Sequence, residues 1–426
     1  MSVGAPTNLT TWDEVHEAFR RRELRQALYD EGAVVMADCL LDLHGPDHRD
    51  RRRLENRLFR REVFAHWEHE VLGATISDTL TPFVAEGSGD LIVIGYRTSM
   101  NLTALIAGID RVRGTAEETE HLYQIVKKLS EGATLVHSVR DHDEVRAEVL
   151  DVLGRFDEEF LQPSIARRMA LLEAVRAGEA QDRVEDELPR DVLMTLLRSR
   201  DRLHLPAEVL RREVAFYLQA GSHSTANAFT HTVDELFSWV GEHPEDLDRA
   251  RADLRFLRAC VHETLRHHPA SPVAWRRATE EIELGSGRRL APGDLVILDI
   301  VSANHDPGIW GDDAERFDPH RDAPPSVPRW GHSFGGGLHA CIGQELDGGL
   351  DSGLDSGLDP GDPGAGDRET SDGAPAGELY GTVAVMVQAF LAAGGRPDPS
   401  NPPQLDPNST RRHFSSYPVT FGRAAR

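Results

Sequence analysis

The chain has 426 residues, of which 47 are basic and 71 acidic, so its formal net charge at pH 7 is −24. A surface this acidic excludes general binding to nucleic acid or to an anionic membrane, because those partners are negatively charged as well. No run approaches the ~20 apolar residues of a membrane helix, and the N-terminus lacks the basic and apolar regions of a secretory signal. We therefore expect a cytoplasmic protein.

Most of the first half of the chain has the periodicity of helices. Helical patterns follow one another at Thr11–Tyr29, Pro46–Leu72, Ala116–Leu129, Glu144–Ala177 and Arg190–Ser199. The short apolar run Asp90–Gly95 predicts either a strand or the start of a buried helix. A long helix is then predicted from Pro206 to Trp239, since proline is favoured in the first turn. Its apolar residues change face along its length, which predicts burial on several sides.

The second half is more mixed. A helix is predicted for Glu245–His267, and a proline-rich coil for Asp306–Pro328. Strand-like segments occur at Ala274–Ala278, Ile282–Leu284, Leu295–Val301 and around Tyr417–Phe421. A helical pattern resumes at Leu379–Ala392.

The segment Gly348–Gly377 differs from the rest in composition. It holds nine Gly, six Asp, one Glu and one Arg. Such a segment buries too little apolar surface to offset the entropy lost on ordering. We predict a disordered acidic loop rather than a calcium-binding repeat, because its four-residue period matches neither the EF-hand loop nor the nonapeptide repeat.

The three cysteines are Cys39, Cys260 and Cys341. This number is too small and uneven for a disulfide framework and fits a reducing compartment. Cys341 alone lies in a glycine-rich segment, Phe334-Gly335-Gly336-Gly337-Leu338-His339-Ala340-Cys341-Ile342-Gly343. Glycines allow a tight turn and a close approach of the backbone to a ligand, and a cysteine thiolate can ligate haem iron. The alternative for Cys341 is a buried structural cysteine in a glycine-rich turn. We expect Cys39 and Cys260 to be core residues.

Two further features accompany this segment. Glu263 and Arg266 share one helix face at i and i+3, ahead of a coil that contains Arg316. The long helix carries Ala220-Gly221-Ser222-His223-Ser224-Thr225 near its middle. Glycine and hydroxyl residues are costly there, and the hydroxyls can bend a helix by bonding to its carbonyls.

Together these segments resemble the cytochrome P450 family of haem-thiolate monooxygenases. The cysteine segment matches the family signature Phe-Gly-x-Gly-x-His-x-Cys-x-Gly at every fixed position, and the resemblance extends from about Thr11 to Gly422. It implies a mainly α fold with a small β-sheet, shortened at its N-terminus. It also implies a single haem-thiolate domain over residues 1–426, with residues 348–377 inserted.

The resemblance further implies a haem b whose iron is ligated by Cys341. Haem contacts would come from His48, Arg52, Ala220, Gly221, Arg276, Phe334, Gly335, His339 and Gly343. His48, Arg52, Arg276 and His339 would hold the propionates. A structural triad would comprise Glu263, Arg266 and Arg316.

The implied reaction is hydroxylation, or a similar oxidation, of a small organic or natural-product substrate with dioxygen and two electrons. The electrons would come from a donor such as a ferredoxin and its reductase. His223, Ser224 and Thr225 would act in catalysis. Substrate contacts would come from Phe216, Gln219, Val273, Ala274, Phe414 and Ser415.

The long helix departs from the family pattern Ala-Gly-x-acid-Thr. Ser224 keeps the hydroxyl, while His223 replaces the acid with an imidazole of ordinary pKa ~6.5, which can also carry protons. Three interpretations stay open. His223 relays protons, or it points away, or the enzyme needs no relay because substrate supplies the protons or peroxide the oxygen.

Two other departures concern the N-terminus and the insertion. Thr11–Val15 resembles the start of the family's B helix, which would leave out the A helix and the first two strands of the small sheet. The acidic loop would lie near the surface where the family docks its donors, and it should repel an acidic donor. We therefore expect unusual electron delivery. The alternative functions are peroxide-driven oxidation, oxidative coupling or dehydration on the same haem, or non-catalytic binding of haem or another ligand.

Overall fold

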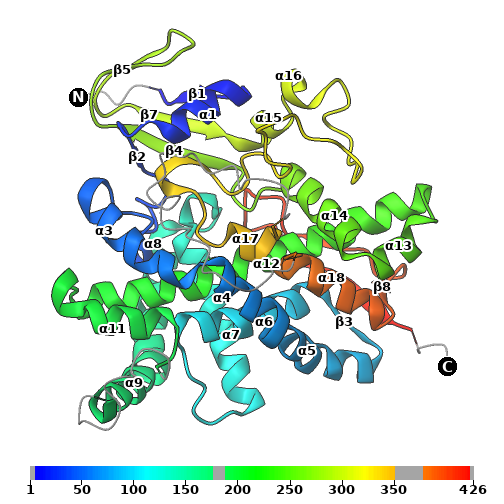
Figure 1. The fold of residues 1–426 in the computed structure, drawn as a ribbon, viewed down its shortest axis with the longest axis horizontal. Coiled ribbons are helices and arrows are strands. Elements are labelled where there is room, and N and C mark those ends of the chain that lie inside the picture. The colour runs from blue at the N-terminus through cyan, green and yellow to red at the C-terminus, as the bar shows by residue number, and fades with distance from the viewer. Residues whose placement is uncertain (1–4, 176–187, 351–377, 423–426) are drawn as a thin grey trace. The chain divides into compact units, whose positions relative to one another are not determined.

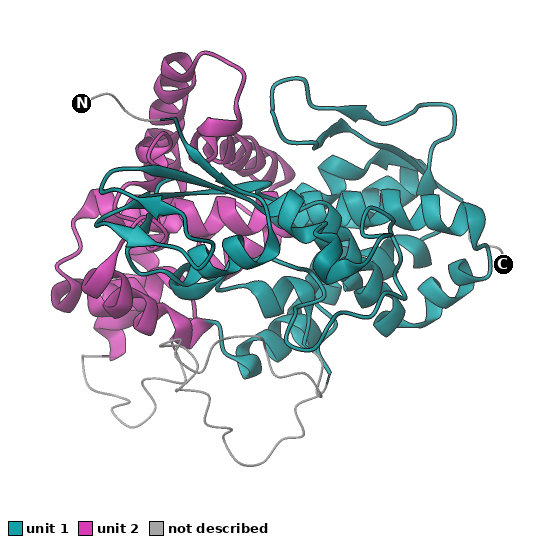
Figure 2. Cartoon of the chain, turned by 90° about the horizontal axis from the view of Figure 1, so that it is seen from above, with its two compact units in different colours: residues 1–28, 59–98, 224–426 teal, residues 29–58, 99–223 magenta. Residues whose placement is uncertain are grey.

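The computed structural model describes residues 5–175, 188–350 and 378–422. The chain divides into two compact units, coloured separately in Figure 2. Unit 1 comprises residues 1–28, 59–98 and 224–426, and unit 2 comprises residues 29–58 and 99–223. Helices make up most of the described structure (Figure 1), and every strand of the described residues belongs to unit 1. The predicted mainly α fold with a small sheet is confirmed. The predicted acidic loop lies outside the described residues, apart from residues 348–350.

The helices and strands of unit 1 come from its three chain segments. Its helices are α1 (Trp12–Arg20), α4 (Arg61–His66), a π-helical turn (Trp67–Leu72), α5 (Gly73–Glu86), α13 (Asp246–Ala252), α14 (Leu254–His267), α15 (Ile300–Asn304), α16 (Pro307–Trp310), a 3-10 turn (Gly337–His339), α17 (Gln344–Gly348) and α18 (Thr382–Ala392). Its strands are β1 (Thr7–Leu9), β2 (Leu24–Gln26), β3 (Ser88–Asp90), β4 (Val273–Ala278), β5 (Ile282–Glu283), β6 (Arg289–Leu290), β7 (Leu295–Asp299), β8 (Gly395–Pro397), β9 (Gln404–Leu405), β10 (Phe414–Ser416) and β11 (Pro418–Phe421).

The main sheet has four strands in the order β1-β7-β4-β2. Strand β1 is parallel to β7, with Thr7 opposite Val296, and β2 is antiparallel to β4, with Leu24 opposite Ala278. Two predictions were wrong here. The helix does not run on to Tyr29, because the backbone groups of β2 pair with β4. The sheet also does not lack both early strands, because β1 adds one at its edge.

Helix α1 covers this sheet and starts where the sequence predicts. The Thr11 side chain accepts a hydrogen bond from the Glu14 backbone N–H, which caps the helix, and acids in the first turn suit its dipole. Val15 and Phe19 then pack with apolar residues of the strands, such as Leu298, in one buried cluster. The amphipathic pattern of α1 thus fixes which of its faces meets the sheet.

Three smaller sheets complete unit 1. One has the order β3-β11-β8, β9 pairs with β10, and β5 pairs with β6. Helix α6 (Leu91–Ala107) begins directly after β3, with the Asp90 carboxylate accepting from the Ile92 N–H over 2.9 Å. Of the two interpretations of Asp90–Gly95, the helix start is therefore confirmed.

The described residues of unit 2 form helices joined by turns and loops, with no strand among them. It contains α2 (Ala33–Met36), α3 (Gly45–Glu55), a 3-10 turn (Asn56–Leu58), α7 (Ala116–Ala133), a 3-10 turn (Leu135–His137), α8 (His142–Phe156), a π-helical turn (Asp157–Leu161), α9 (Gln162–Ala174) and α11 (Val192–Leu203). Helix α6 and the 36-residue α12 (Ala207–Glu242) each contribute to both units. Helix α12 stays helical through Gly221, so the residues that could have bent it do not break it.

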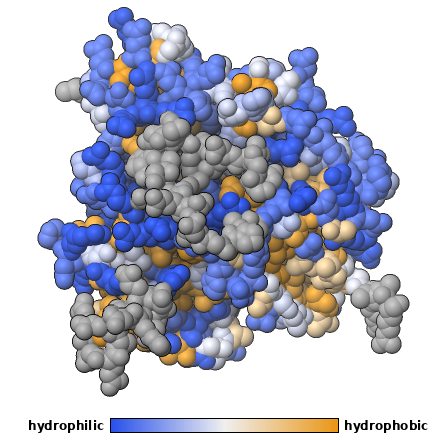
Figure 3. All heavy atoms as spheres, viewed as in Figure 1, coloured by the Kyte–Doolittle hydropathy of each residue, from blue (hydrophilic) through white to orange (hydrophobic). Residues whose placement is uncertain are grey.

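Hydrophilic residues cover most of the described surface in Figure 3, with apolar residues between them. None of the helices traced in residues 5–175, 188–350 and 378–422 is long and apolar enough to cross a membrane.

Candidate active site

The glycine-rich cysteine loop is held by its own backbone and by α1. The Cys341 N–H donates to the Phe334 carbonyl over 2.8 Å. Gly335 and Gly337 have φ of +70° and +60°, which side-chain-bearing residues rarely adopt. A Cβ on Gly337 would lie 2.2 Å from the backbone oxygen of Phe19. Both the backbone conformation and the close contact with α1 therefore require glycine.

Cys341 differs from the other cysteines in accessibility. Cys39 and Cys260 are fully buried, and Cys341 is exposed. Burial raises the thiol pKa of both buried cysteines, which keeps them protonated. Since the thiolate is the form that binds metals, the exposed Cys341 could hold a haem iron through its sulfur. Among the described residues, no group of three or more His, Cys, Asp or Glu side chains could hold a metal ion.

Arg276, a predicted propionate partner, lies next to the cysteine loop. It is 3% exposed, and its guanidinium carbon lies 5.2 Å from the ring centre of Phe19. It donates to the Gln26 side-chain oxygen over 3.1 Å. Because Phe19 also contacts Gly337, α1 links Arg276 to the loop that carries His339. Within unit 1, the structure thus brings these predicted haem contacts together on either side of Phe19.

The other two predicted propionate partners lie in unit 2, on α3. His48 and Arg52 are one turn apart, and His48 is 2% exposed. Burial, and secondarily the positive charge of Arg52, lowers the pKa of His48 to about 4. His48 is therefore uncharged at neutral pH and can offer a neutral hydrogen-bond donor to an anionic group.

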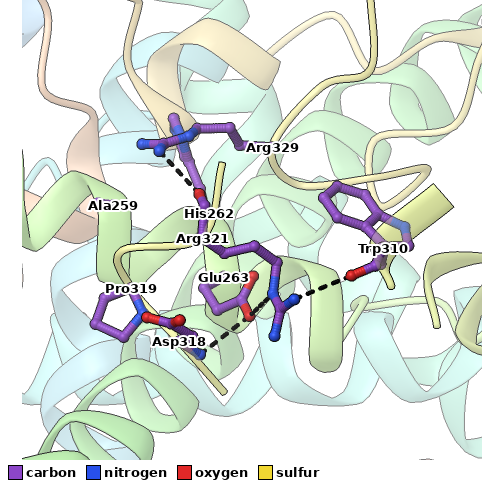
Figure 4. A pocket seen from close by; sticks show the side chains of 8 residues that line it. All are labelled: Ala259, His262, Glu263, Trp310, Asp318, Pro319, Arg321 and Arg329. Atoms are coloured by element: carbon purple, nitrogen blue, oxygen red, sulfur yellow. Dashed lines mark hydrogen bonds and ion pairs between the residues drawn. The ribbon is translucent and has the colours of Figure 1, made fainter. Parts of the chain in front are cut away.

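The predicted structural triad is correct in two of its three members. Arg266 donates to both oxygens of Glu263, over 2.7 and 2.8 Å. The third member is Arg321, whose Nε donates to Glu263 over 3.1 Å (Figure 4). Arg316 was the wrong choice, because its guanidinium lies 6.0 Å from the ring centre of Trp239, and only its backbone oxygen takes part. The coil turns back after Arg316 and delivers Arg321 to the acid.

This network keeps Glu263 charged. Burial alone would raise its pKa, but the hydrogen bonds from Arg266 and His267 lower the pKa to about 2. Asp318 also donates its backbone N–H to Glu263 over 3.1 Å, which ties the coil to α14. The small pocket in Figure 4 is lined by Glu263, Asp318 and Arg321, together with Ala259, His262, Trp310, Pro319 and Arg329.

The central turn of α12 is closely packed in unit 2. A Cβ on Gly221 would lie 2.5 Å from Cγ2 of Thr103. The Ser222 hydroxyl is buried, donates to the Leu218 carbonyl over 2.6 Å and lies 2.7 Å from the Thr103 hydroxyl. Glycine is therefore needed where α6 packs against this turn. The buried Ser222 hydroxyl has its hydrogen-bond partners within the protein.

Comparisons with known proteins agree with this geometry. The sequence model of the family described as cytochrome P450 matches residues 117–346, more than half of the 426. The chain belongs to the cytochrome P450 family. The solved structure of CalO2 has the same fold, with a TM-score of 0.67 at 19% identity over 97% of this chain and 90% of that one.

Two curated relatives show how far the sequence similarity extends. The bifunctional cytochrome P450/NADPH–P450 reductase 2 of Bacillus subtilis is 29% identical over 38% of this chain and 17% of its own length. The cyclooctat-9-en-7-ol 5-monooxygenase of Streptomyces melanosporofaciens is 27% identical over 78% of this chain and 74% of its own length. Matches to several other P450 relatives span about a third of their length.

The structure adds one polar pair to the P450 helix that lacks the usual acid. In unit 1 the Thr225 hydroxyl donates to both oxygens of Asp347, each over 2.8 Å. Desolvation raises the pKa of the half-buried Asp347, and this hydrogen bond opposes the rise. His223 and Ser224 are half-buried. No sequence pattern connects Asp347 with Thr225, because 122 positions separate them.

The predicted substrate contacts fall on three elements of this P450. Phe216 and Gln219 are buried on α12 in unit 2, and Val273 and Ala274 are half-buried on β4. Phe414 packs against His231 and Tyr417, with ring centres 5.1 Å away in both cases. Ser415 is exposed and donates to the backbone oxygens of β9.

Proposed function

We propose that this P450 is a haem-thiolate monooxygenase that hydroxylates, or similarly oxidises, a small organic or natural-product substrate. The observation that carries the proposal is the exposed Cys341 on its glycine-shaped loop, within a chain of this family. When bound, haem b would supply the iron that activates dioxygen with two electrons and two protons. One oxygen atom would enter the substrate and the other would leave as water. In this proposal both units belong to one haem domain.

In this proposal some residues would bind the haem and others would hold or move protons. Cys341 would be the axial ligand, with Phe334, Gly335 and Gly343 shaping its loop. His48, Arg52, Arg276 and His339 would bind the propionates, and Ala220 and Gly221 would pass close to the ring. His223, Ser224 and Thr225 would hold or move protons. Substrate contacts would come from Phe216, Gln219, Val273, Ala274, Phe414 and Ser415.

Electrons would come from a separate donor such as a ferredoxin with its reductase. The Bacillus subtilis relative carries a P450 and a reductase in one protein, as its name states. The acidic segment after Cys341 carries six net negative charges, so a donor with a basic docking face should reduce this protein faster than an acidic one. Comparing the salt dependence of both reduction rates tests this.

The decisive experiment is the absorbance spectrum of the purified, reduced protein with carbon monoxide. The red-shifted Soret band of an axial thiolate is expected, and Cys341→Ser should abolish it. Cys260→Ala is the matched control and should keep the band, because Cys260 is buried. Absence of haem, or a band at the position of a neutral thiol in the wild-type protein, would refute the proposal.

A second candidate is peroxide-driven oxidation, and one observation favours it. The central turn of α12, Ala220–Thr225, contains no carboxylate, so the usual acidic proton carrier is missing from that turn. Turnover with hydrogen peroxide, combined with none from reductase and dioxygen, would select this function. Fast coupled turnover with reductase and dioxygen would exclude it.

A further inference from the structure

The hydroxyl of Thr225 has an unusual partner for a residue inside a helix. A serine or threonine within a helix commonly donates to the backbone carbonyl four residues earlier. Farther along α12, Thr230 and Thr232 do so, over 2.9 and 2.7 Å. Thr225 is 3% exposed and instead shares its hydroxyl hydrogen between the two oxygens of Asp347, each at 2.8 Å. This hydrogen bond therefore joins two helices of unit 1.

Asp347 is held in place on the helix that follows the cysteine loop. It comes six residues after Cys341, on α17, which packs against α14 and α18 (Figure 1). The backbone carbonyls of its two neighbours in sequence both accept hydrogen bonds. One is donated by the Thr382 hydroxyl over 2.9 Å and the other by His262 over 2.7 Å. The carboxylate is thus fixed against α12 from both sides of its own helix.

The surroundings of Asp347 favour its protonated form. Burial raises the pKa of Asp347 to about 7, and the bond from Thr225 opposes that rise. Among the described residues these are the two causes of the shift. Helix α18 carries no ionisable residue, and His262 on α14 is uncharged at neutral pH because burial lowers its pKa to about 3.

No other ionisable group on the described elements that pack around α17 is a cause of that shift. These groups are Glu345 on α17 itself, His223 on the central turn of α12, Arg258 on the adjoining part of α14, and Arg61, Glu62, His66 and Glu68 on α4 and the π-helical turn after it. Asp347 can therefore exchange a proton near neutral pH without a charged partner that would fix its state.

A carboxyl group with a pKa near the working pH is well suited to proton transfer. Protonated Asp347 can give its proton to the Thr225 oxygen while the Thr225 hydroxyl passes its own hydrogen onward. One proton then leaves the pair, and Asp347 becomes a carboxylate. Because Asp347 is half-buried, water can return the proton. The dioxygen reduction of the proposed function consumes two protons, so the pair would act twice in each turnover.

We propose that Asp347 is the carboxylate partner of the central turn of α12, a positioning residue that orients the Thr225 hydroxyl and supplies it with protons. The inference rests on the proposed function with dioxygen. The central turn, Ala220–Thr225, contains no carboxylate of its own, and the acid comes instead from the helix after the cysteine loop.

Two isosteric substitutions separate proton supply from a merely structural bond. In Asp347→Asn the amide oxygen can still accept the Thr225 hydrogen, but the side chain cannot release a proton. Thr225→Val removes the hydroxyl itself, and Thr225→Ser keeps it. The assay is dioxygen consumption by the holoprotein without added substrate, at a saturating concentration of a ferredoxin and its reductase, from about pH 5.5 to 8.5.

The wild-type rate should fall as the pH rises through about 7, where Asp347 loses its proton. Asp347→Asn and Thr225→Val should both lower the rate at least ~10-fold below pH 7 and remove this pH dependence, whereas Thr225→Ser should keep it. Asp90→Asn is the matched control and should also keep it. Asp90 is a half-buried carboxylate that accepts from the Ser416 hydroxyl over 2.7 Å, away from α12.

Infrared spectroscopy reads the proton directly and works with or without haem. The difference between wild type and Asp347→Asn should contain the carbonyl stretch of one carboxylic acid, which loses half its intensity near pH 7. Absence of this band at every pH would overturn the inference. A wild-type rate and pH profile in Asp347→Asn, with only Thr225→Val impaired, would overturn it too, because the bond would then be structural. If the wild-type protein held no haem, the proposed function would fail, while the infrared result would still report the proton on Asp347.

Discussion

Replacing His332 by Phe should make the protein less sensitive to acid. His332 is 4% exposed, stacks on Trp12 with ring centres 3.9 Å apart, and lies two residues before Phe334, where the cysteine segment begins. Burial, and next the neighbouring His16, lowers the pKa of His332 to about 3. The unfolded chain takes up this proton near pH 6.5, whereas the folded protein resists it. The free energy of unfolding is therefore not reduced by His332 above pH 6.5, and it decreases as the pH falls from 6.5 toward 3.

The expected size follows from the two pKa values. A pH of 5 lies about 1.5 pH units below the ordinary histidine pKa. At about 1.36 kcal/mol per unit, protonation of His332 in the unfolded chain lowers the free energy of unfolding by about 2 kcal/mol. Phe cannot take up a proton and keeps an aromatic ring against Trp12. The difference in unfolding free energy between His332→Phe and wild type should therefore shift by about 2 kcal/mol in favour of the variant between pH 7.5 and pH 5.

The assay is thermal unfolding followed by circular dichroism at several pH values. For a chain of 426 residues, a change of 2 kcal/mol moves the midpoint by roughly 2 °C if the whole chain unfolds together. His69→Phe is the matched control and should show no such trend, because the His69 side chain is 52% exposed. A constant difference between His332→Phe and wild type across this pH range would refute the reasoning.

Two further predictions follow from the contacts of the site. Arg321→Met should lower the free energy of unfolding by about 3 kcal/mol because it removes a partner of the buried Glu263. Replacing the exposed Arg316 by Met should lower it by less than about 0.5 kcal/mol. Equal shifts in thermal midpoint would restore Arg316 to the triad. Gly337→Ala places a Cβ 2.2 Å from the Phe19 backbone oxygen and should abolish the thiolate band of the carbon monoxide spectrum. Gly154→Ala, with nothing within 4 Å of its Cβ, should keep that band and raise stability by up to about 1 kcal/mol; an unchanged band in Gly337→Ala would contradict the packing argument.

The candidate site combines features that match the cytochrome P450 family with one feature that departs from it. The loop around Cys341 and the network around Glu263 are built from local motifs and are well packed in unit 1. The central turn of α12 lacks an acid, and the structure shows Thr225 bonded to Asp347 there. The comparison of peroxide with reductase and dioxygen tests whether this turn supports the activation of dioxygen.

The amino-acid sequence by itself determined the features that depend on neighbouring residues. The apolar and helix-favouring residues between Pro206 and Trp239 predicted a helix that the structure extends only slightly, to Ala207–Glu242. Glu263 and Arg266 are one helical turn apart, so their pairing follows from the spacing. The glycines before Cys341 predicted a tight turn, because few other residues tolerate a positive φ.

The tertiary structure decided the pairings between distant segments. Leu24–Gln26 follows a helical pattern but forms a strand, since its backbone hydrogen bonds are satisfied by β4, about 250 residues away. Arg321 rather than Arg316 completes the triad because the coil folds back on α14. Arg51 and Glu213 lie on separate helices, 162 positions apart, and only the fold brings them into a buried ion pair. A sequence pattern records local periodicity, but the charge of a buried group depends on partners that the fold brings to it.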